Sequence, residues 1–285
     1  MASGHRIVLG KYDARLPRPS GQNVDVDGRR CWIALLVATL LPLGAATACT
    51  SSSAPPPASP FAPAAPGTAQ VPGQVIDLAN WYLTLPSGEN NRPDEVHQPQ
   101  LNTFTDPWFH LDDTRSGVVF TANEGGVTTK NSTYPRSELR EMTGTEKASW
   151  SNTIGNHVLR LRQAVTRLPT VKPHVVTAQI HDAENDVIEV RLEDRRLLVA
   201  SDNGSDKITL DPAYVLDTPY DLEIDATGRH IRVSYNATPK ADISLSGSGW
   251  YFKTGSYVQS NPSRGDAPDA LGEVVLYSLT VQHTP

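Results

Sequence analysis

Three short polar stretches hold most of the side chains in this sequence that could do chemistry together. They are Arg136-Ser-Glu-Leu-Arg140, Gln179-Ile-His181 and Tyr251-Phe-Lys-Thr-Gly-Ser-Tyr-Val-Gln259, and each lies in strand-like sequence. Alternate side chains of a β-strand share one face, so the polar side chains within each stretch point together. These are Arg136, Glu138 and Arg140, then Gln179 and His181, then Tyr251, Lys253, Tyr257 and Gln259. The sequence therefore predicts one active site built from three strands.

A carboxylate-bearing sugar polymer is the substrate class that suits these side chains. The hydrogen on the carbon next to a uronate carboxylate is hard to remove, because the sugar already carries a negative charge. An Arg with a Gln and a His can hydrogen-bond the carboxylate and spread the charge that develops. A Tyr or His can take the proton, and a Tyr can protonate the leaving oxygen. The predicted reaction is β-elimination, for which we expect no metal and no organic cofactor.

Each stretch alone has a plainer interpretation. Residues 136–140 could be a surface ladder of salt bridges, residues 179–181 a solvated strand face, and residues 251–259 a packing strand or a carbohydrate-stacking platform. Two other classes of protein also compete, a non-catalytic carbohydrate-binding module and a glycoside hydrolase. A hydrolase needs two carboxylates, whereas Glu138 is the only acid in the three stretches and would be ionised between its arginines.

The first seventy or so residues differ from the rest of the chain. Residues 1–28 are a polar extension, and Arg29-Arg30 precede an apolar run to Cys49 with the form of an export signal. A retained membrane anchor is the alternative, although a membrane-spanning helix requires ~20 consecutive apolar residues. Ala46-Thr-Ala-Cys49 resembles a lipoprotein cleavage box, so we expect export from a bacterial cell, either as a secreted protein or tethered by a lipidated Cys49. Residues 50–74 are rich in Ser, Ala and Pro, which is typical of a linker.

One domain is expected over residues 75–285. The chain has two cysteines, Cys31 and Cys49, both in the export region, so this domain has no disulfide, no thiolate metal site and no cysteine nucleophile. The formal net charge of −6 argues against a nucleic-acid partner. Arg136, Arg140 and Lys253 would form a local basic site that fits a polyanion, and a monomer is the default expectation.

Short alternating or β-branched segments follow Val75, separated by Gly, Pro, Asn and Asp. Many short strands without a long amphipathic helix predict an all-β antiparallel sandwich or jelly roll. Residues 225–229 lie between two alternating runs and predict a hairpin turn. The predicted strands are residues 81–85, 117–121, 158–162, 175–181, 187–192, 220–224, 230–235 and 273–281.

The three polar stretches resemble the markers of the alginate lyases of polysaccharide lyase family 7, the alginate lyase 2 type domain. Those markers are an Arg-Ser/Thr-Glu-Leu/Asn-Arg strand, a Gln-Ile/Val-His strand and a Tyr-Phe-Lys-Ala-Gly-x-Tyr-x-Gln strand, in that order. Thr254 stands where the family usually has Ala. The flanking residues 78–86 and 134–142 also look like the family, and the resemblance covers roughly residues 75–285.

The resemblance implies a β-jelly roll of two antiparallel sheets with a substrate cleft across the concave sheet. It implies that Arg136 and Gln179 neutralise the substrate carboxylate, that His181 helps them or acts as base, and that Tyr257 is the acid and a candidate base. Glu138, Arg140, Tyr251, Lys253 and Gln259 would shape the cleft and bind neighbouring sugars. Arg136 and Arg140 share a face, so the sequence leaves open which of them makes the decisive contact.

The resemblance also implies the substrate, alginate, cleaved to oligosaccharides with unsaturated non-reducing ends. Mannuronate and guluronate differ in configuration at the carbon that loses its proton, so His181 is the candidate base for guluronate. Ile180 is associated in the family with guluronate-containing stretches. Another polyuronate, such as a glucuronan, is the alternative substrate.

Overall fold

Antiparallel β-strands make up most of the regular structure in the part of the chain that the computed structural model describes, residues 67–89, 91–201 and 204–285. One sheet contains β1 (Trp81–Glu89), β2 (Arg92–Val96), β5 (Arg136–Thr143), β6 (Glu146–Lys147), β8 (His174–His181), β9 (Asp186–Glu193), β10 (Arg196–Ser201), β11 (Asp206–Asp211) and β15 (Tyr251–Val258). The other contains β3 (Phe109–Leu111), β4 (Val118–Asn123), β7 (Asn156–Arg167), β12 (Tyr220–Thr227), β13 (His230–Tyr235), β14 (Thr238–Ser244) and β16 (Leu271–Thr284). Short 3₁₀ helices cover Pro72–Gln74, Gln100–Thr103 and Pro262–Arg264.

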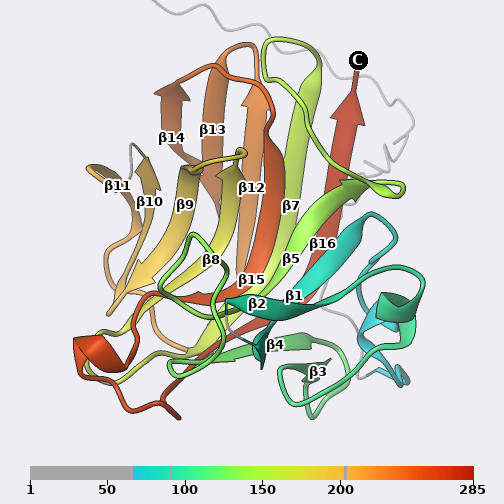
Figure 1. Cartoon of the computed structure of the whole chain (residues 1–285). Coiled ribbons are helices and arrows are strands. Elements are labelled where there is room, and N and C mark those ends of the chain that lie inside the picture. Colours follow the sequence, from blue (N-terminus) through green and yellow to red (C-terminus); the bar gives the residue numbers. More distant parts are fainter. Residues whose placement is uncertain (1–66, 90, 202–203) are drawn as a thin grey trace, which may run out of the picture. The chain divides into compact units, whose positions relative to one another are not determined.

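The two sheets pack face to face (Figure 1). The strand order of the first sheet is β11-β10-β9-β8-β15-β5-β1-β2, with β6 paired to β5. The order of the second is β14-β13-β12-β7-β16-β4-β3. Each predicted strand segment overlaps one of these strands, and the prediction of an all-β antiparallel sandwich is confirmed.

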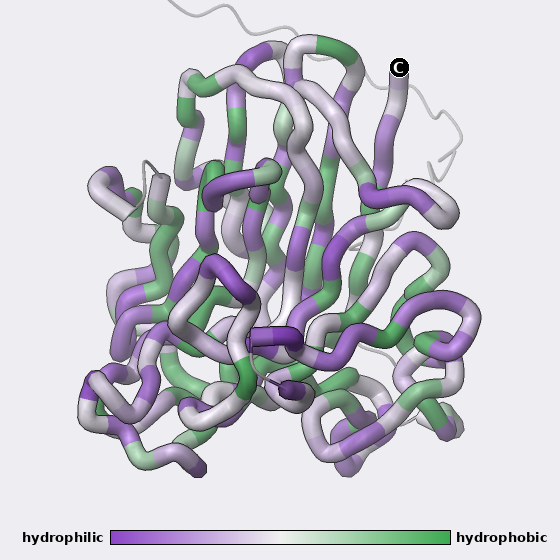
Figure 2. Tube along the Cα trace, viewed as in Figure 1, coloured by the Kyte–Doolittle hydropathy of each residue, from purple (hydrophilic) through white to green (hydrophobic). Residues whose placement is uncertain are grey.

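The core lies between the sheets and is built by the alternation of side chains along each strand. In the first sheet, Leu139, Ile180 and Phe252 are fully buried and point toward the second sheet, where they meet residues such as Phe120 and Leu161. Figure 2 shows this alternation as hydrophobic and hydrophilic segments that follow one another along the strands. Because the apolar neighbours point inward, the polar residues between them point to the opposite face of the first sheet.

The β12–β13 connection is the hairpin that the sequence predicts. Thr227 pairs with His230, and the two residues between them, Gly228 and Arg229, have φ angles of +61° and +69°. A two-residue loop with positive φ at both positions matches the right-handed twist of the flanking strands.

Strand β15 lies in the middle of the first sheet, between β8 and β5, and needs Gly255 to fit there. Gly255 has a φ of +144°, and a Cβ at this position would lie 2.4 Å from the backbone oxygen of Ser137. Only glycine combines this backbone conformation with so close an approach of the next strand. The glycine in the third polar stretch is therefore explained by packing of β15 against β5.

Residues 67–74, the last part of the segment predicted as linker, contact the sandwich. The Gly67 N–H donates to the Thr114 carbonyl at 3.1 Å, and Arg115 Nη1 donates to Gln70 Oε1 at 3.0 Å. The polar extension, the export signal and Cys49 lie outside the described residues, so the domain boundaries stay predictions. In the described ranges, no helix has the length and apolar character to cross a membrane.

Glu124, which directly follows β4, is a buried acid that should make stability depend on pH. The residue is 1% exposed, and neither carboxylate oxygen has a hydrogen-bond partner. Burial, together with nearby Asp266, raises the pKa of Glu124 to about 8, with Lys172 opposing the rise. The folded state therefore holds this proton more tightly than the unfolded chain, and the stability that it contributes is lost as pH rises from about 4.5 through about 8.

Replacing Glu124 by Gln is expected to raise the free energy of unfolding at pH 9 by about 1–3 kcal/mol, with little change at pH 5. The amide imitates the protonated acid, so no buried charge has to form. Denaturant unfolding at both pH values measures the effect, and Glu146→Gln, a substitution of an exposed residue, is the control. A gain that is equal at the two pH values would contradict a buried proton at Glu124.

Candidate active site

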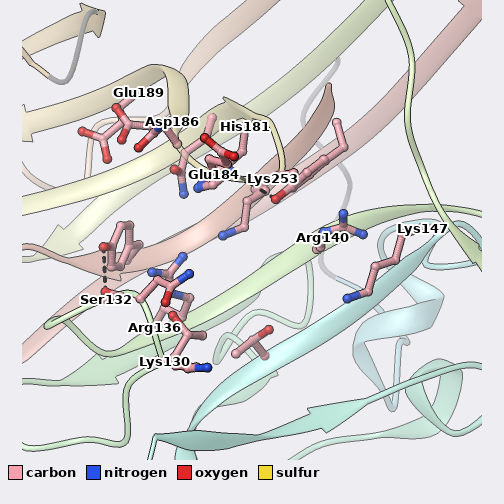
Figure 3. Close-up of a pocket in the computed structure, with 18 of the residues that line it drawn as sticks. Lys130, Ser132, Arg136, Arg140, Lys147, His181, Glu184, Asp186, Glu189 and Lys253 are labelled. Carbon is pink, nitrogen blue, oxygen red and sulfur yellow. Dashed lines mark hydrogen bonds between the residues drawn. The ribbon is translucent and has the colours of Figure 1, made fainter. Parts of the chain in front are cut away.

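The face of the first sheet that points away from the core carries a cavity of about 570 Å³ (Figure 3). Strand register brings the three polar stretches together there. Lys253 lies between Arg140 on β5 and Gln179 on β8, Tyr257 is paired with Arg136, and Tyr251 is paired with His181. Of the residues predicted for the site, those that line the cavity are Arg136, Arg140, Gln179, His181, Tyr251, Lys253 and Tyr257.

Glu138 lies beneath the cavity and is 1% exposed. Its carboxylate accepts hydrogen bonds from Arg136 Nη1 at 3.0 Å, from Lys253 Nζ at 2.5 Å and from the Gln179 amide. Burial alone would raise the pKa of Glu138, but the charges of Lys253 and Arg136 outweigh it and hold the pKa below its usual range. Glu138 is therefore an ionised anchor for three donor side chains, and the Arg136–Glu138 pair is buried, unlike the pairs of an exposed ladder of salt bridges.

Tyr257 is held by its ring and by its hydroxyl. The Arg136 guanidinium carbon lies 3.7 Å from the centre of the Tyr257 ring, a cation–π contact. The Tyr257 hydroxyl lies 3.0 Å from Ser132 Oγ, drawn as a dashed line in Figure 3. Ser132 in turn donates to the Tyr134 carbonyl at 3.1 Å, so the Ser132 oxygen accepts the Tyr257 proton. The phenol is thus fixed at the cavity with a proton that it can give up.

His181 is held as a neutral ring with one free lone pair. Its Nδ1 lies 2.6 Å from the Asp182 carbonyl, which can only accept, so Nδ1 carries the proton and Nε2 is the basic nitrogen. Burial and the charge of Lys253 lower the pKa of His181. The Tyr251 hydroxyl, 3.1 Å from His181 Nδ1, donates to the same carbonyl at 2.8 Å, and the Arg140 guanidinium carbon lies 3.7 Å from the Tyr251 ring centre. This arrangement suits a general base.

The structure does not place every predicted residue in the cavity. Gln259 follows the last residue of β15, its backbone pairs with His174, and its carbonyl accepts a hydrogen bond from Lys172. His181 and Tyr257 both line the cavity, but His181 contacts Tyr251, which is six residues from Tyr257 along β15. Neither Glu138 nor Gln259 lines the cavity. The sugar-binding roles predicted for these two residues stay predictions.

Most of the basic and acidic side chains lie on different sides of the cavity, with Lys253 between them and His181 beside the acidic group (Figure 3). The basic side holds Lys130, Arg136, Arg140 and Lys147, and the acidic side holds Glu184, Asp186 and Glu189; a further acid of the lining, Glu95, lies near Tyr82 with Arg140 and Lys147. Burial, with the nearby Asp186, raises the pKa of Glu189 to about 7. A polyanion would therefore be drawn to the basic side, and the acidic side would face its hydroxyl groups.

Several lining residues were missed in the sequence. Tyr82 and Thr84 come from β1, and the alternating segment 81–85 already placed them on one face. Lys130, Ser132 and Glu184 belong to connections, where no periodic pattern shows which way a side chain points. In the described part of the chain, no group of three or more His, Cys, Asp or Glu residues could hold a metal ion.

Comparison with known proteins places this sandwich in one class. The model of the family described as alginate lyase matches residues 76–283. The structure of alginate lyase AlgAT5 from polysaccharide lyase family 7 is 46% identical, with a TM-score of 0.73, over 76% of this chain and 100% of that one. The alginate lyase from Corynebacterium sp. is 44% identical, with a TM-score of 0.73, over 75% and 98%. The class is thus that of the polysaccharide lyases with this jelly-roll sandwich.

The chain belongs to the alginate lyase family, polysaccharide lyase family 7. An alginate lyase of Klebsiella pneumoniae is 38% identical over 76 residues, which are 25% of this chain and 24% of that protein, so this match spans about a quarter of the curated relative. The family and the class of carbon–oxygen lyase that the sequence predicts are confirmed.

Two structures of alginate lyase A1-II′ contain oligosaccharides. A variant with a tyrosine replaced by phenylalanine holds a product designated GGG, and it is 27% identical, with a TM-score of 0.67, over 76% of this chain and 100% of that one. A variant with a histidine and a tyrosine replaced holds a substrate designated GGMG, and it is 26% identical, with a TM-score of 0.66, over 76% and 97%.

Proposed function

We propose that this protein cleaves the 1,4-glycosidic bonds of alginate by metal-independent β-elimination, with a lean toward guluronate-containing stretches. The observation that carries the proposal is that a neutral His181 with a basic Nε2 and a fixed Tyr257 phenol line one cavity with Arg136 and Gln179. Proton removal, proton delivery and charge neutralisation are the three tasks of the reaction, and each has a side chain of the right chemistry.

In the proposed reaction, Arg136 and Gln179 hold the uronate carboxylate and stabilise the charge that spreads into it. We assign this task to Arg136 rather than Arg140, because Arg136 shares Glu138 with Gln179 and lies against Tyr257, whereas Arg140 lies against Tyr251. A base removes the proton next to the carboxylate, the bond to the glycosidic oxygen breaks, and a carbon–carbon double bond forms.

For guluronate the base is His181 Nε2, Tyr257 gives its phenol proton to the leaving oxygen, and solvent afterwards carries the proton from His181 back to Tyr257. For mannuronate, whose proton lies on the other side of the ring, Tyr257 must begin as the phenolate, take the proton next to the carboxylate and pass that same proton to the leaving oxygen. His181 on β8 contacts Tyr251, which lies six residues from Tyr257 along β15, and this separation supports different roles for His181 and Tyr257. The oligosaccharides designated GGG and GGMG in A1-II′ support alginate as the substrate.

Ultraviolet absorbance tests the proposal, because elimination creates a conjugated unsaturated uronate. The full chain is incubated with poly-guluronate, poly-mannuronate, alginate and a glucuronan, each with a chelator. We expect absorbance to rise on alginate, and faster on poly-guluronate than on poly-mannuronate. A flat trace on all four polymers with binding retained would instead indicate a carbohydrate-binding module, and a rise on glucuronan alone would change the substrate.

The charge of Lys253 should set an alkaline limit to activity. Burial, Arg136 and Arg140 lower the pKa of Lys253 to about 8, because two cations and desolvation outweigh the single carboxylate of Glu138. We therefore expect kcat/KM for alginate to fall as pH rises above about 8, since the neutral amine no longer attracts a polyanion.

Initial rates at fixed ionic strength between pH 6 and pH 10 measure this fall. Lys253→Arg, which stays charged over that range, should remove it or move it to higher pH. Lys147→Arg is the matched control, because Lys147 lines the same cavity but is exposed, and it should keep the wild-type profile. An unchanged alkaline fall in Lys253→Arg would assign it to another group.

We also propose that the protein is exported as a monomer, either released outside the cell or tethered to the cell surface by a lipidated Cys49. The form of the sequence from Arg29 to Cys49 supports export, and the Ser, Ala and Pro composition of residues 50–74 supports a spacer. Mass spectrometry of the mature N-terminus tests this, since a lipidated Cys49 and cleavage after Ala48 without lipid give different masses.

A further inference from the structure

Glu141 is a buried acid that the proposed reaction does not use. It is 2% exposed and directly follows Arg140, where the pairing of β5 with β15 ends at the Arg140–Lys253 pair. Beyond that pair the Glu141 carboxylate replaces the backbone ladder, because its Oε2 accepts the N–H of Phe252 at 2.8 Å. The same oxygen accepts Trp150 Nε1–H at 2.9 Å. Glu141 therefore fixes the backbone at the start of β15 from the core side of the sheet.

The backbone that Glu141 holds carries two residues of the candidate site. Phe252 is flanked by Tyr251, which contacts His181, and by Lys253, which contacts Glu138. Phe252 itself points into the core, so both neighbours point into the cavity. A shift of the Phe252 backbone would move both contacts at once.

A chain of hydrogen bonds connects Glu141 to the second sheet. Its Oε1 lies 2.6 Å from His283 Nε2 on β16, and His283 Nδ1 lies 2.7 Å from His157 Nδ1 on the neighbouring strand β7 (Figure 1). His157 Nε2 lies 3.0 Å from the Ser151 carbonyl and 2.9 Å from the Ile154 carbonyl. The Trp150 ring stacks on His157 with centres 4.4 Å apart and covers the chain.

These distances fix the number of protons in the chain. The two carbonyls only accept, so His157 Nε2 carries a proton, and a neutral His157 then has a lone pair on Nδ1. If His283 is also neutral and donates to an ionised Glu141, its own Nδ1 lone pair faces that of His157 at 2.7 Å. One added proton turns this repulsion into a hydrogen bond, and a second would place two N–H groups face to face. Every hydrogen bond from Glu141 to His157 can form only if these three residues hold one more proton than an ionised Glu141 and two neutral imidazoles would hold.

We propose that Glu141 is a positioning residue for the Tyr251–Lys253 end of β15, and that it acts through this chain with His283 and His157, which holds a single shared proton. Within the described part of the chain, Glu141 has no ion pair other than that with His283, and the nearby Glu146 and Lys147 on β6 are exposed. The positioning role of Glu141 rests on the proposed function, because Tyr251 and Lys253 matter only if the cavity is an active site. The number of protons shared with His283 and His157 does not depend on that function.

Glu141→Gln and Glu141→Ala separate the parts of this proposal. In Glu141→Gln the amide oxygen can accept from Phe252 and Trp150, and the amide nitrogen can donate to His283 Nε2, whose Nδ1–H then donates to His157. Every bond is kept without the added proton. Glu141→Ala loses the chain and leaves the Phe252 N–H without its partner.

Thermal unfolding from pH 5 to pH 10 tests the proton count without any substrate. We expect the melting temperature of Glu141→Gln to increase relative to that of the wild type as pH rises, because only the wild type loses a shared proton. Glu146→Gln should follow the wild type throughout. Nitrogen NMR of the histidine rings should show a proton on one of the two facing Nδ1 atoms in the wild type, either in an imidazolium or, where Glu141 holds the added proton, in a neutral His283 ring, and it should show two neutral rings in Glu141→Gln. Identical pH profiles, or wild-type rings that are both neutral with no proton on either Nδ1, would overturn the single shared proton.

Rates on alginate, measured well below each melting temperature, test positioning. We expect Glu141→Ala to lose about tenfold to a hundredfold in kcat with a smaller change in KM, because misplacing reacting groups by about 1 Å has effects of this size. Glu141→Gln should recover most of the loss. A folded Glu141→Ala that is less stable but keeps the wild-type kcat would show a purely structural residue. If the wild type has no lyase activity, the proposed function fails, while the unfolding and NMR results still decide the proton count.

Discussion

Replacement of Tyr257 by Phe is expected to lower kcat for alginate cleavage by about 10²–10⁴-fold, the usual size of general acid–base catalysis. The substitution removes the proton that the leaving oxygen needs and keeps the ring that packs against Arg136. Substrate binding should change little, because the ring contact and the carboxylate-binding side chains remain. Initial rates by ultraviolet absorbance and binding by calorimetry measure the two quantities separately.

Tyr235→Phe is the control for this loss, because it also removes a tyrosine hydroxyl, but from β13 in the second sheet, where it donates to Asp211. It should keep the wild-type kcat. A Tyr257→Phe variant that retains more than about a tenth of the wild-type kcat would remove Tyr257 from proton transfer. A variant that no longer binds substrate would make Tyr257 a binding residue instead.

Replacement of Glu138 by Ala should be among the most damaging changes to both stability and activity. The substitution leaves the buried cations of Arg136 and Lys253 without their shared carboxylate and frees the Gln179 amide. Removing one partner of a buried ion pair destabilises proteins by about 3–5 kcal/mol. Denaturant unfolding measures this loss, and kcat should fall with it, because three side chains of the site lose their anchor.

A more exposed ion pair provides the comparison. Glu223 accepts a hydrogen bond from Arg160 Nε at 2.7 Å on the second sheet, with both side chains about a third exposed, and Glu223→Ala should cost no more than about 1 kcal/mol. If Glu138→Ala were as mild as Glu223→Ala, Arg136 and Lys253 would not depend on the carboxylate. Glu138→Gln should be intermediate, since an amide can still accept one hydrogen bond but carries no charge.

Alternation along strands was enough to predict most of the site, because it needs only local sequence. It placed Arg136, Gln179 and Lys253 on the outward face of the sheet. It also predicted the bounds of β13, which begins at His230 and ends at Tyr235 as expected. Alternation gives the face on which a side chain lies but not its depth, so it did not show that Glu138 lies beneath the cavity. The depth follows from the two neighbouring strands, whose Lys253 and Gln179 side chains cover Glu138, and cross-strand register is not a local property.

The remaining differences have similar physical causes. Gln259 continues the alternation of β15 in the sequence, but the strand ends at Val258, so the pattern extends one residue beyond its structural basis. Strand β8 has an irregular register between Val176 and Ala178, which a strict period of two cannot represent. Glu141 did leave a signal, because it follows Leu139 on the core-facing side of β5, where a charged residue requires an explanation.

The buried position of Glu138 also restricts how this site can change in evolution or by design. Binding of a neutral polysaccharide would favour an apolar residue in place of Arg136. Such a variant leaves the buried Glu138 carboxylate with one cation fewer. The variant therefore loses stability before it gains a new specificity. The acid and its donors must therefore change together or not at all. The preference for a polyanion is thus protected by the folding of the sheet as well as by selection on the substrate.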